Sequence, residues 1–593
     1  MGKKEITAGA EKLSDFFPKE RAQYYYVDKT GFILDLISAG FLDSFPQLIL
    51  RPRRFGKTLT LSMLKTFFDQ DEKDKAWIFS SLGISRHEEI CDQYQNKYPV
   101  IAVSFKDTES KDYSMLLHRM NITLKDEALR HMKAIEAVNT FDGRERSPEL
   151  RLTDTERGKL CRIAEEKGTE LDLMEFFPTI MKALYGYYGI KPLVFIDEYD
   201  APLNNAFSNE YFEEAASLIR AMFSSGFKTN GCLGGVVMTG ILQVSKSNIL
   251  SGLNNLVVNS VVDGSGYSEA FGFTQKEVDE MLVYYGLQDR RDDLRDWYDG
   301  YCIREAYVYN PYSVANAVRS FSKASASAVC ENYWLDTGGT KLLKEMLLSC
   351  KGDHELKKLF DRLLNGDSVV ASYTAAVAYS DILESSETII GALLLSGYLT
   401  MDGTRLRIPN REVMAGFTAL CKWYNKEADE AMLPELVKAY AEGKSDAAKD
   451  ILDEYFEETL RARDLDSSEN NYHYFICGAM AVVSKRLGDW SFESNEQKTL
   501  GYADIALINR KAKRAVIIEE KALRDEAPKG SYEEEARWVE SRVKRLAGEA
   551  FNQIHKTRYD SKARRQGYDV TCYANVYFRH EAFVIKEPGL CQQ

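Results

Sequence analysis

A Gly-Lys-Thr turn is the segment of this sequence best suited to chemistry. Gly56, Lys57 and Thr58 follow an apolar stretch at 48–50 and precede a helical pattern at 59–64. A strand, a tight loop and a helix start form a phosphate cradle, because backbone N–H groups and the positive end of the helix face an anion. Lys57 would reach the β- and γ-phosphates of a nucleotide such as ATP, and the Thr58 hydroxyl would hold Mg²⁺.

The loop departs from the usual pattern at its start. The first glycine of G-x-x-x-x-G-K-[ST] is replaced by Arg51, which does not take positive φ freely. Arg54 and Phe55 complete the predicted nucleotide-binding loop. A basic turn before a surface helix is the alternative interpretation of this segment alone.

A second segment supplies two acids at the end of a predicted strand. Four apolar residues at 193–196 precede Asp197 and Glu198. Ligands bind at the carboxyl ends of strands in open α/β sheets, so both carboxylates are expected at the site. Asp197 would belong to the Mg²⁺ shell, and Glu198 would accept a proton from the attacking water. The alternative is a strand that ends in an acidic turn.

A third apolar stretch, 234–240, carries Thr239 near its end. We predict that Thr239 senses the γ-phosphate, although a threonine at a strand end is as often a helix cap. The polar loop that follows, 243–255, identifies no arginine finger. The tyrosines at 24–26 either stack on the adenine base or, as is more usual, pack in the core.

Acidic and basic residues near the C-terminus form another pattern. The stretches 501–508 and 514–521 are predicted as a hairpin that brings together Asp504, Glu519 and Lys521. Residues two apart in a strand share a face, so Glu519 and Lys521 should point together. Asp504 and Glu519 would bind Mg²⁺, or Mn²⁺ as an alternative, and Lys521 would orient or deprotonate a water. A solvent-exposed hairpin with ordinary surface charges is the alternative.

Composition bounds the class of protein. The 593 residues are 45% hydrophobic and 28% charged, with a net charge of −13, as in a soluble globular protein of several domains. The ten cysteines include no C-x-x-C pair, which disfavours a zinc module or a disulfide framework. No signal peptide or membrane span is recognisable, so we expect a cytoplasmic protein without membrane contact. Between 501 and 593, 18 Lys and Arg exceed 14 Asp and Glu, so this segment would best tolerate a polyanion.

The motifs together resemble a known family. They occur in one order as Tyr26–Thr30, Arg51–Thr58, Ile196–Asp200, Ser251–Asn255, Phe271–Thr274, Trp297–Tyr301 and Tyr309–Ser313. This set resembles the AAA-ATPase-like family whose members carry a C-terminal nuclease-like domain of the PD-(D/E)XK superfamily. In that family the Arg-Pro-Arg-Arg-Phe-Gly-Lys loop is usual, so the missing first glycine is a family trait.

The resemblance implies the fold class and the division of the chain. We expect an α/β protein with a P-loop AAA-like ATPase core at 1–270, a helical lid at 271–345, a helical connector at 346–455 and a PD-(D/E)XK-type nuclease domain at 456–593. A homo-oligomer is also expected, because AAA-like enzymes complete their sites between neighbours.

The resemblance also suggests further residues near the nuclease core. Gln553, Lys556 and Tyr559 lie three apart on a predicted helix face and would contact a phosphate backbone. A plain amphipathic helix is the alternative interpretation. Glu469 could complete the metal shell, whereas His473 is more simply a packed core histidine. Glu496 stands in a stretch altered from the family pattern.

The expected function is an ATP-hydrolysing protein coupled to a Mg²⁺-dependent nuclease that acts on nucleic acid, with DNA as the expected substrate. The alternative is an ATPase switch whose C-terminal domain binds nucleic acid or protein without cleavage. A chaperone-like remodeller is a third, weaker hypothesis.

Overall fold

The computed structural model describes most of the chain and divides it into two compact units, Met1–Cys421 and Lys422–Gln593. The described residues are 3–18, 24–43, 45–139, 148–244, 253, 255–262, 267–323, 329–334, 343–344, 346–347, 354–377, 385–459, 490–494, 505–523, 531–556, 559–578 and 581–588. None of the helices described there is long and apolar enough to cross a membrane.

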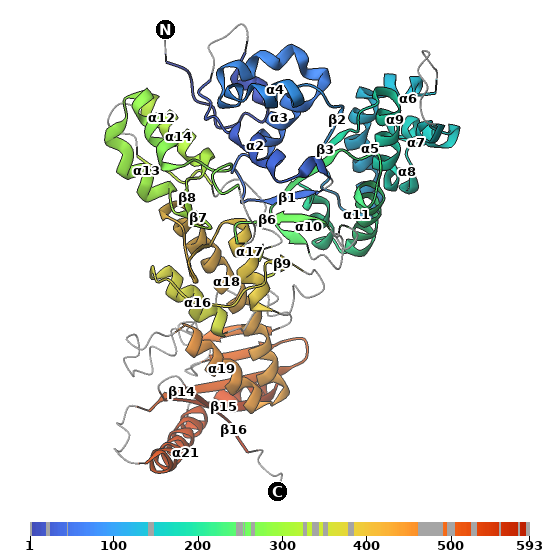
Figure 1. The fold of residues 1–593 in the computed structure, drawn as a ribbon. Helices are drawn as coiled ribbons and strands as arrows, with labels where there is room; N and C mark the ends of the chain where they lie inside the picture. The colour runs from blue at the N-terminus through green and yellow to red at the C-terminus, as the bar shows by residue number, and fades with distance from the viewer. Residues whose placement is uncertain are drawn as a thin grey trace. The chain divides into compact units, whose positions relative to one another are not determined.

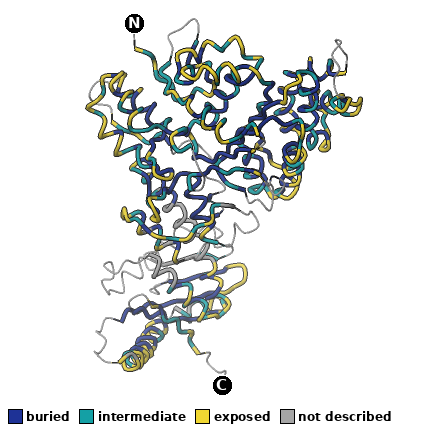
Figure 2. Tube along the Cα trace, viewed as in Figure 1, coloured by how far each residue is buried: buried dark blue, intermediate teal, exposed yellow. Residues whose placement is uncertain are grey.

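A five-stranded parallel sheet organises the first unit. Its order is β2 (Val100–Ser104), β3 (Leu193–Asp197), β4 (Gly235–Gly240), β1 (Gln47–Leu50) and β6 (Val257–Asn259). The strands are short, apolar and fully or largely buried, as expected for a parallel sheet covered on both faces. Figure 2 shows these strands in the dark blue of buried residues. All five carboxyl ends meet at one edge, and that edge carries the site.

Helices cover both faces of this sheet. On one face α2 (Gly31–Ser38) and α3 (Lys57–Phe68) pack their apolar residues onto β1, β2, β3 and β4. In Figure 1, α10 (Ala201–Phe207) and α11 (Phe212–Phe227) lie on the other side of the sheet. Two layers of helix around a parallel sheet give the α/β class that the sequence predicted.

A helical insertion separates β2 from β3. It consists of α5 (Tyr113–Arg130), α6 (Met132–Ala137), α7 (Asp154–Ala164), α8 (Glu170–Met174) and α9 (Phe176–Tyr188). Side-chain caps at Asp112, Thr153 and Thr169 accept the free N–H groups that start α5, α7 and α8. The insertion therefore returns the chain to β3 without disturbing the site.

A smaller helical body follows the sheet. It contains α12 (Gln275–Tyr285), α13 (Arg291–Tyr298), the hairpin β7 (Tyr301–Ile303) and β8 (Ala306–Val308), and α14 (Pro311–Lys323). Thr274 and Glu277 form a capping box at the start of α12. The aromatic residues Tyr298 and Tyr309 lie in the core of this body. Beyond it come α16 (His354–Leu364), α17 (Ser386–Ser396) and the hairpin β10 (Thr400–Asp402) and β11 (Arg405–Arg407).

The second unit is built on another five-stranded sheet. Its order is β12 (Trp490–Ser494), β13 (Ile505–Asn509), β14 (Arg514–Ala522), β15 (Asp569–Phe578) and β16 (Glu581–Lys586). The predicted hairpin is present as the antiparallel pair β13 and β14, whereas β14 and β15 are parallel. The crossover between β14 and β15 contains α21 (Tyr532–Lys556) and α22 (Tyr559–Arg565).

The two faces of this sheet have different cores. One face packs against residues from the C-terminal half of α18 (Arg411–Glu442) and from α19 (Ser445–Thr459). The opposite face packs against α21, whose buried residues recur at helical spacing: Val539, Val543, Leu546, Ala547, Ala550 and Ile554. Because helical residues from 436 onward share the core of this sheet, the second unit begins well before residue 456.

Candidate functional site

The Gly-Lys-Thr turn connects β1 to α3 as predicted, and its backbone explains the unusual loop sequence. Gly56 caps the N-terminus of α3 with φ +83°, and Arg54 adopts φ +66°. Arg51 is not among the described residues with positive φ. The left-handed positions of this loop therefore lie at 54 and 56, and no glycine is needed at 51.

Arg51 instead has a structural task that sequence reasoning missed. Its buried guanidinium donates to the carbonyl oxygens of Leu50 and Asn259 at 2.9 Å each and of Tyr267 at 3.1 Å. It also lies over the ring of Phe271, with its central carbon 5.3 Å from the ring centre. Burial lowers the pKa of Arg51 to about 10. The side chain joins the start of the loop to the segment that follows β6.

Lys57 lies under the loop. Its Nζ donates to the carbonyl oxygens of Arg51 at 2.8 Å and Pro52 at 3.0 Å, and only 7% of the residue is exposed. Burial lowers the pKa of Lys57 to about 8, against a smaller opposing effect of Asp197 and Glu198. The two loop carbonyls hold the ammonium group inside the cradle, next to the position expected for phosphates.

Asp197, at the end of β3, accepts hydrogen bonds from the start of α3 and from the end of β4. The Thr58 hydroxyl donates to its Oδ2 at 2.6 Å, and the Thr239 hydroxyl donates to its Oδ1 at 2.6 Å. Asp197 and Thr239 are both almost fully buried. Because β4 lies between β1 and β3, Thr239 is next to both the loop and the acid. The structure thus brings together three residues that lie far apart in the sequence.

Glu198 follows directly on Asp197 and has a strained backbone. Its φ is +52°, in the left-handed region that non-glycine residues rarely adopt. Burial, with a further contribution from the Asp197 carboxylate, raises the pKa of Glu198. Left-handed strain of this kind persists only where the surroundings hold it, and it is common at functional sites. Glu198 lines the same cavity as Lys57 and Thr58.

Two neighbours of this acid were not predicted to act but fix its geometry. Tyr199 donates to the carbonyl of Leu242 at 2.8 Å and accepts from the N–H of Val244 at 3.0 Å. Asp200 accepts from the N–H groups of Ile241 and Leu242 at 3.1 and 2.9 Å. Both tie the end of β3 to the turn after β4. Their position directly after Asp197 and Glu198 in the sequence was the one signal that could have indicated this role.

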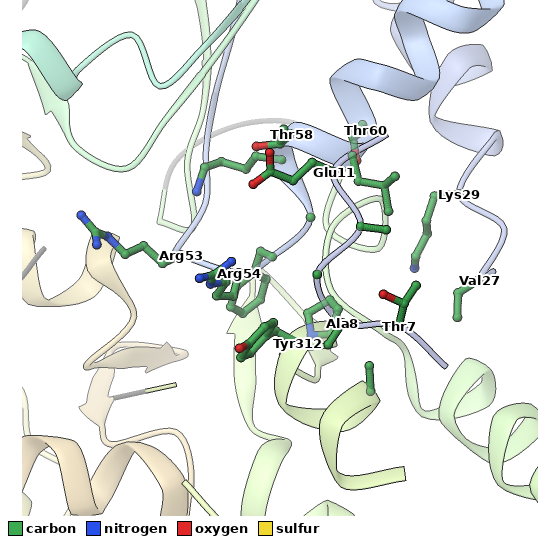
Figure 3. Close-up of a pocket in the computed structure, with 18 of the residues that line it drawn as sticks. Thr7, Ala8, Glu11, Val27, Lys29, Arg53, Arg54, Thr58, Thr60 and Tyr312 are labelled. Carbon is green, nitrogen blue, oxygen red and sulfur yellow. The ribbon is translucent and has the colours of Figure 1, made fainter. Parts of the chain in front are cut away.

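The site opens into a cavity of about 1000 Å³. Figure 3 shows Arg53, Arg54, Thr58 and Tyr312 around it, together with Thr7, Ala8 and Glu11 of the N-terminal segment. The guanidinium of Arg54 lies over the Tyr312 ring at 4.7 Å, and Phe55 packs edge-on against Tyr301 at 4.9 Å. The nucleotide loop is therefore in contact with the helical body that the sequence predicted as a lid.

The tyrosines at 24–26 have different surroundings. Tyr25 and Tyr26 line the cavity. Tyr26 also packs edge-on against Phe16 and Phe17, at 5.3 and 5.6 Å, and belongs to the core of the first unit. Tyr24 is partly buried against that core. Core packing, the more usual role expected from the sequence, is confirmed for Tyr26.

The C-terminal acids lie on β14. Lys521 Nζ contacts Glu519 Oε1 at 3.2 Å, as expected for residues two apart on one face. Glu520 points to the other face, where it accepts a hydrogen bond from Tyr577 at 2.6 Å. Asp504 lies outside the described residues. The described part of β13 begins at Ile505, which pairs with Ile518 on β14.

Two family models match this chain. Residues 13–250 match the family described as "Predicted AAA-ATPase", and residues 467–587 match the "PD-(D/E)XK nuclease superfamily". The chain carries an AAA-ATPase-like domain followed by a PD-(D/E)XK nuclease-superfamily domain. The resemblance seen in the sequence motifs is confirmed, and so is the expected fold class.

The alignments with two other proteins cover much of this chain. "Uncharacterized protein in vnfD 5'region" of Azotobacter chroococcum mcd 1 is 27% identical over 429 residues, which cover 70% of this chain and 69% of that protein. A Walker-type ATPase of Pyrococcus abyssi is 10% identical with a TM-score of 0.33, over 69% of this chain and 97% of its own.

The donors of the AAA-ATPase-like domain fit a magnesium nucleotide. A buried carboxylate, two hydroxyls and a buried ammonium converge at a helix N-terminus beside a large cavity. Hard oxygen donors suit Mg²⁺, and the ammonium suits phosphate. In the nuclease-superfamily domain, Glu519 is the one predicted metal ligand among the described residues. No group of three or more His, Cys, Asp or Glu side chains within the described part of the chain is arranged to hold a metal.

The residues predicted to contact nucleic acid lie near the junction of two described helices. Gln553 and Lys556 are exposed in the last turn of α21, and Tyr559 is the first residue of α22. Residues 557 and 558 lie outside the described residues, so a common face for all three stays a prediction. Glu469, His473 and Glu496 lie outside the described residues.

Proposed function

We propose that the AAA-ATPase-like domain binds and hydrolyses ATP at the cavity beside Gly56, Lys57 and Thr58. The observation that supports this most is the pair of 2.6 Å hydrogen bonds from Thr58 and Thr239 to the buried Asp197. A helix start and a strand end both donate to one carboxylate at the end of a third element, next to a phosphate cradle. Such convergence is what a magnesium nucleotide site requires.

Each residue has a proposed role in this reaction. Gly56 and the N–H groups at the start of α3 cradle the phosphates, with Arg54 and Phe55 shaping the loop, and Lys57 neutralises phosphate charge. Thr58 and Asp197 hold Mg²⁺, which when bound polarises the phosphate oxygens.

Glu198 accepts the proton of the attacking water. Burial raises the pKa of Glu198, so its carboxylate binds a proton more strongly than the carboxylate of an ordinary glutamate does. Thr239 donates to Asp197 from the strand between loop and acid, and we propose that it reports the γ-phosphate.

The test of this function is ATP turnover by the full chain with Mg²⁺. Lys57→Ala should abolish hydrolysis, because the point charge on the phosphates is lost. The matched control is Lys73→Ala, on a lysine of the same helical region that does not line the cavity. Unchanged turnover in Lys57→Ala would mean that the loop has another function.

We further propose that the C-terminal domain cleaves nucleic acid, with DNA as the first expected substrate. Asp504 and Glu519 would hold Mg²⁺ or Mn²⁺, and Lys521 would orient or deprotonate a water. The contact of Lys521 with Glu519 on one face of β14 supports this assignment. Gln553, Lys556 and Tyr559 are the proposed contacts to the nucleic-acid backbone.

Labelled DNA and RNA, incubated with Mg²⁺ or Mn²⁺ and with or without ATP, test this activity. Asp504→Ala should lose cleavage but retain ATP turnover, and Glu533→Ala on the exposed start of α21 is the control. A wild-type protein that cuts neither DNA nor RNA would favour the alternative, an ATPase switch whose second domain binds without cutting. We also propose the domain limits at 270, 345 and 455 and a homo-oligomeric assembly. The limit at 455 refers to the nuclease-like domain, which lies within the larger compact unit Lys422–Gln593.

A further inference from the structure

Lys106 is a cation at the nucleotide site that neither the motifs nor the proposed chemistry use. It follows β2 by two residues, and β2 runs parallel to β3 with Ser104 opposite Asp197. Lys106 therefore extends from the same carboxyl edge of the sheet as Asp197. It lines the cavity together with Thr58 and Glu198.

In this structure the ammonium group of Lys106 is held by an acid from the N-terminal segment. Its Nζ lies 2.6 Å from Glu11 Oε1, and the two side chains are 49% and 54% exposed. The contact with Glu11, and to a smaller extent the charge of Glu198, raises the pKa of Lys106. A half-exposed ion pair contributes little to stability, so a stronger anion can replace Glu11.

Glu11 belongs to a segment that borders the cavity, residues 6–11, which we call the strap. Before the strap, the backbone carbonyl of Glu5 accepts a hydrogen bond from the N–H of Tyr25 at 2.8 Å. The N–H of Lys4 donates to the Tyr284 hydroxyl at 2.7 Å. After it, the N–H of Leu13 donates to the hydroxyl of Ser62 on α3 at 3.0 Å. Both ends are thus anchored.

The strap carries a negative charge into the phosphate end of the site. Figure 3 shows Thr7 and Ala8 along the cavity and Glu11 in the region of Thr58. Ala8, Gly9 and Ala10 are small, and a Cβ added at Gly9 would meet nothing within 4 Å. A nucleotide has room to enter, but its terminal phosphate and the Glu11 carboxylate repel one another and compete for the same ammonium group.

We infer that Lys106 is a second cation, besides Lys57, that this chain supplies to the terminal phosphate of bound ATP, and that Glu11 holds it until the nucleotide arrives. This inference rests on the proposed ATP site. It assigns a further positive charge to the terminal phosphate, for which the sequence identified no arginine finger. A charge-assisted hydrogen bond to phosphate is among the stronger ones in proteins, so the exchange from Glu11 to phosphate is favourable.

Breaking the Glu11–Lys106 pair from either side distinguishes this role from a merely structural one. Binding of a non-hydrolysable ATP analogue and of ADP to the full chain is measured by calorimetry with Mg²⁺. Lys106→Ala should lower the affinity for the ATP analogue about tenfold or more, while the affinity for ADP changes little, because ADP lacks the terminal phosphate. Glu11→Gln should raise the affinity for the ATP analogue severalfold, because the carboxylate that competes with the phosphate for Lys106 is removed.

The controls are matched in geometry. Lys125 and Glu166 form another partly exposed pair at 2.6 Å, outside the cavity, so Lys125→Ala and Glu166→Gln should leave both affinities unchanged. Lys106→Arg keeps the charge and should preserve the preference for the ATP analogue over ADP.

The inference is supported if the affinity for the ATP analogue falls in Lys106→Ala and rises in Glu11→Gln. Changes of this affinity in the same direction in both variants, or changes no larger than those of the control pair, would overturn the inference while the ATP site stands. A wild-type chain that binds neither nucleotide would overturn the proposed ATP site, and the inference with it.

Discussion

Glu412 provides a quantitative test of how burial changes the pKa of a carboxyl group and the stability of the protein. This residue, at the start of α18, is fully buried. It accepts hydrogen bonds from the Ser313 hydroxyl at 2.8 Å and from the N–H groups of Tyr333 and Trp334 at 2.8 and 3.1 Å. Burial raises the pKa of Glu412 to about 7, because the hydrogen bonds only partly offset the loss of water around the anion.

The raised pKa makes stability depend on pH with a definite sign. The folded protein holds the Glu412 proton more tightly than the unfolded chain, in which the pKa is 4.5. The stabilisation is therefore fully present below pH 4.5 and is lost as the pH rises through about 7. A shift from 4.5 to about 7 corresponds to a loss of about 3 kcal/mol in the free energy of unfolding.

Replacing Glu412 with glutamine should remove this dependence. The amide keeps an acceptor for the two backbone N–H groups and stays neutral. Relative to the wild type, Glu412→Gln should gain about 2 to 3 kcal/mol of unfolding free energy between pH 5 and pH 8. Urea unfolding followed by tryptophan fluorescence, to which the buried Trp334 contributes, measures the difference.

The control is Glu355→Gln, on an 85% exposed side chain of α16, which should leave the pH dependence of stability unchanged. If wild type and Glu412→Gln lose stability in parallel between pH 5 and pH 8, then Glu412 is charged in the folded protein and the reasoning from burial is wrong.

Three further substitutions probe the site. Glu198→Gln should retain ATP binding but slow hydrolysis at least a hundredfold in a single-turnover assay; a variant as fast as wild type would exclude Glu198 as the base. Arg51→Gly, which restores the common loop pattern, should lower the unfolding free energy by about 2 kcal/mol and weaken nucleotide binding, because three carbonyl groups lose their donor. Gly397→Ala should weaken nucleotide binding, since the added Cβ would lie 2.8 Å from Pro52 in the loop. Gly403→Ala, with positive φ but nothing within 4 Å, is its control, and equal binding in both variants would contradict a contact effect.

Much of the nucleotide site could be predicted from the sequence because its parts are local. A strand, a loop and a helix start occur within 48–64, and the acids at 197 and 198 directly end a buried strand. Short-range patterns of this kind fix the secondary structure and the strand end at which a residue emerges. The hairpin of β13 and β14 was predictable for the same reason.

The core of the second sheet shows the limit of local patterns. Residues of α18 and α19 pack in that core. The sequence did not predict this packing, because it depends on which apolar helix face meets which sheet.

The sequence alone determined the chemical types at the site: a cradle with Lys57 and Thr58, two acids after a strand, and a pair of Glu519 and Lys521 on one strand face. Only the tertiary structure decided their partners. Strand order brought Thr239 to Asp197, and the path of the N-terminal segment brought Glu11 to Lys106. The physical reason is that hydrogen bonds and charges act over a few ångströms in space, and distance along the chain does not determine which groups come that close.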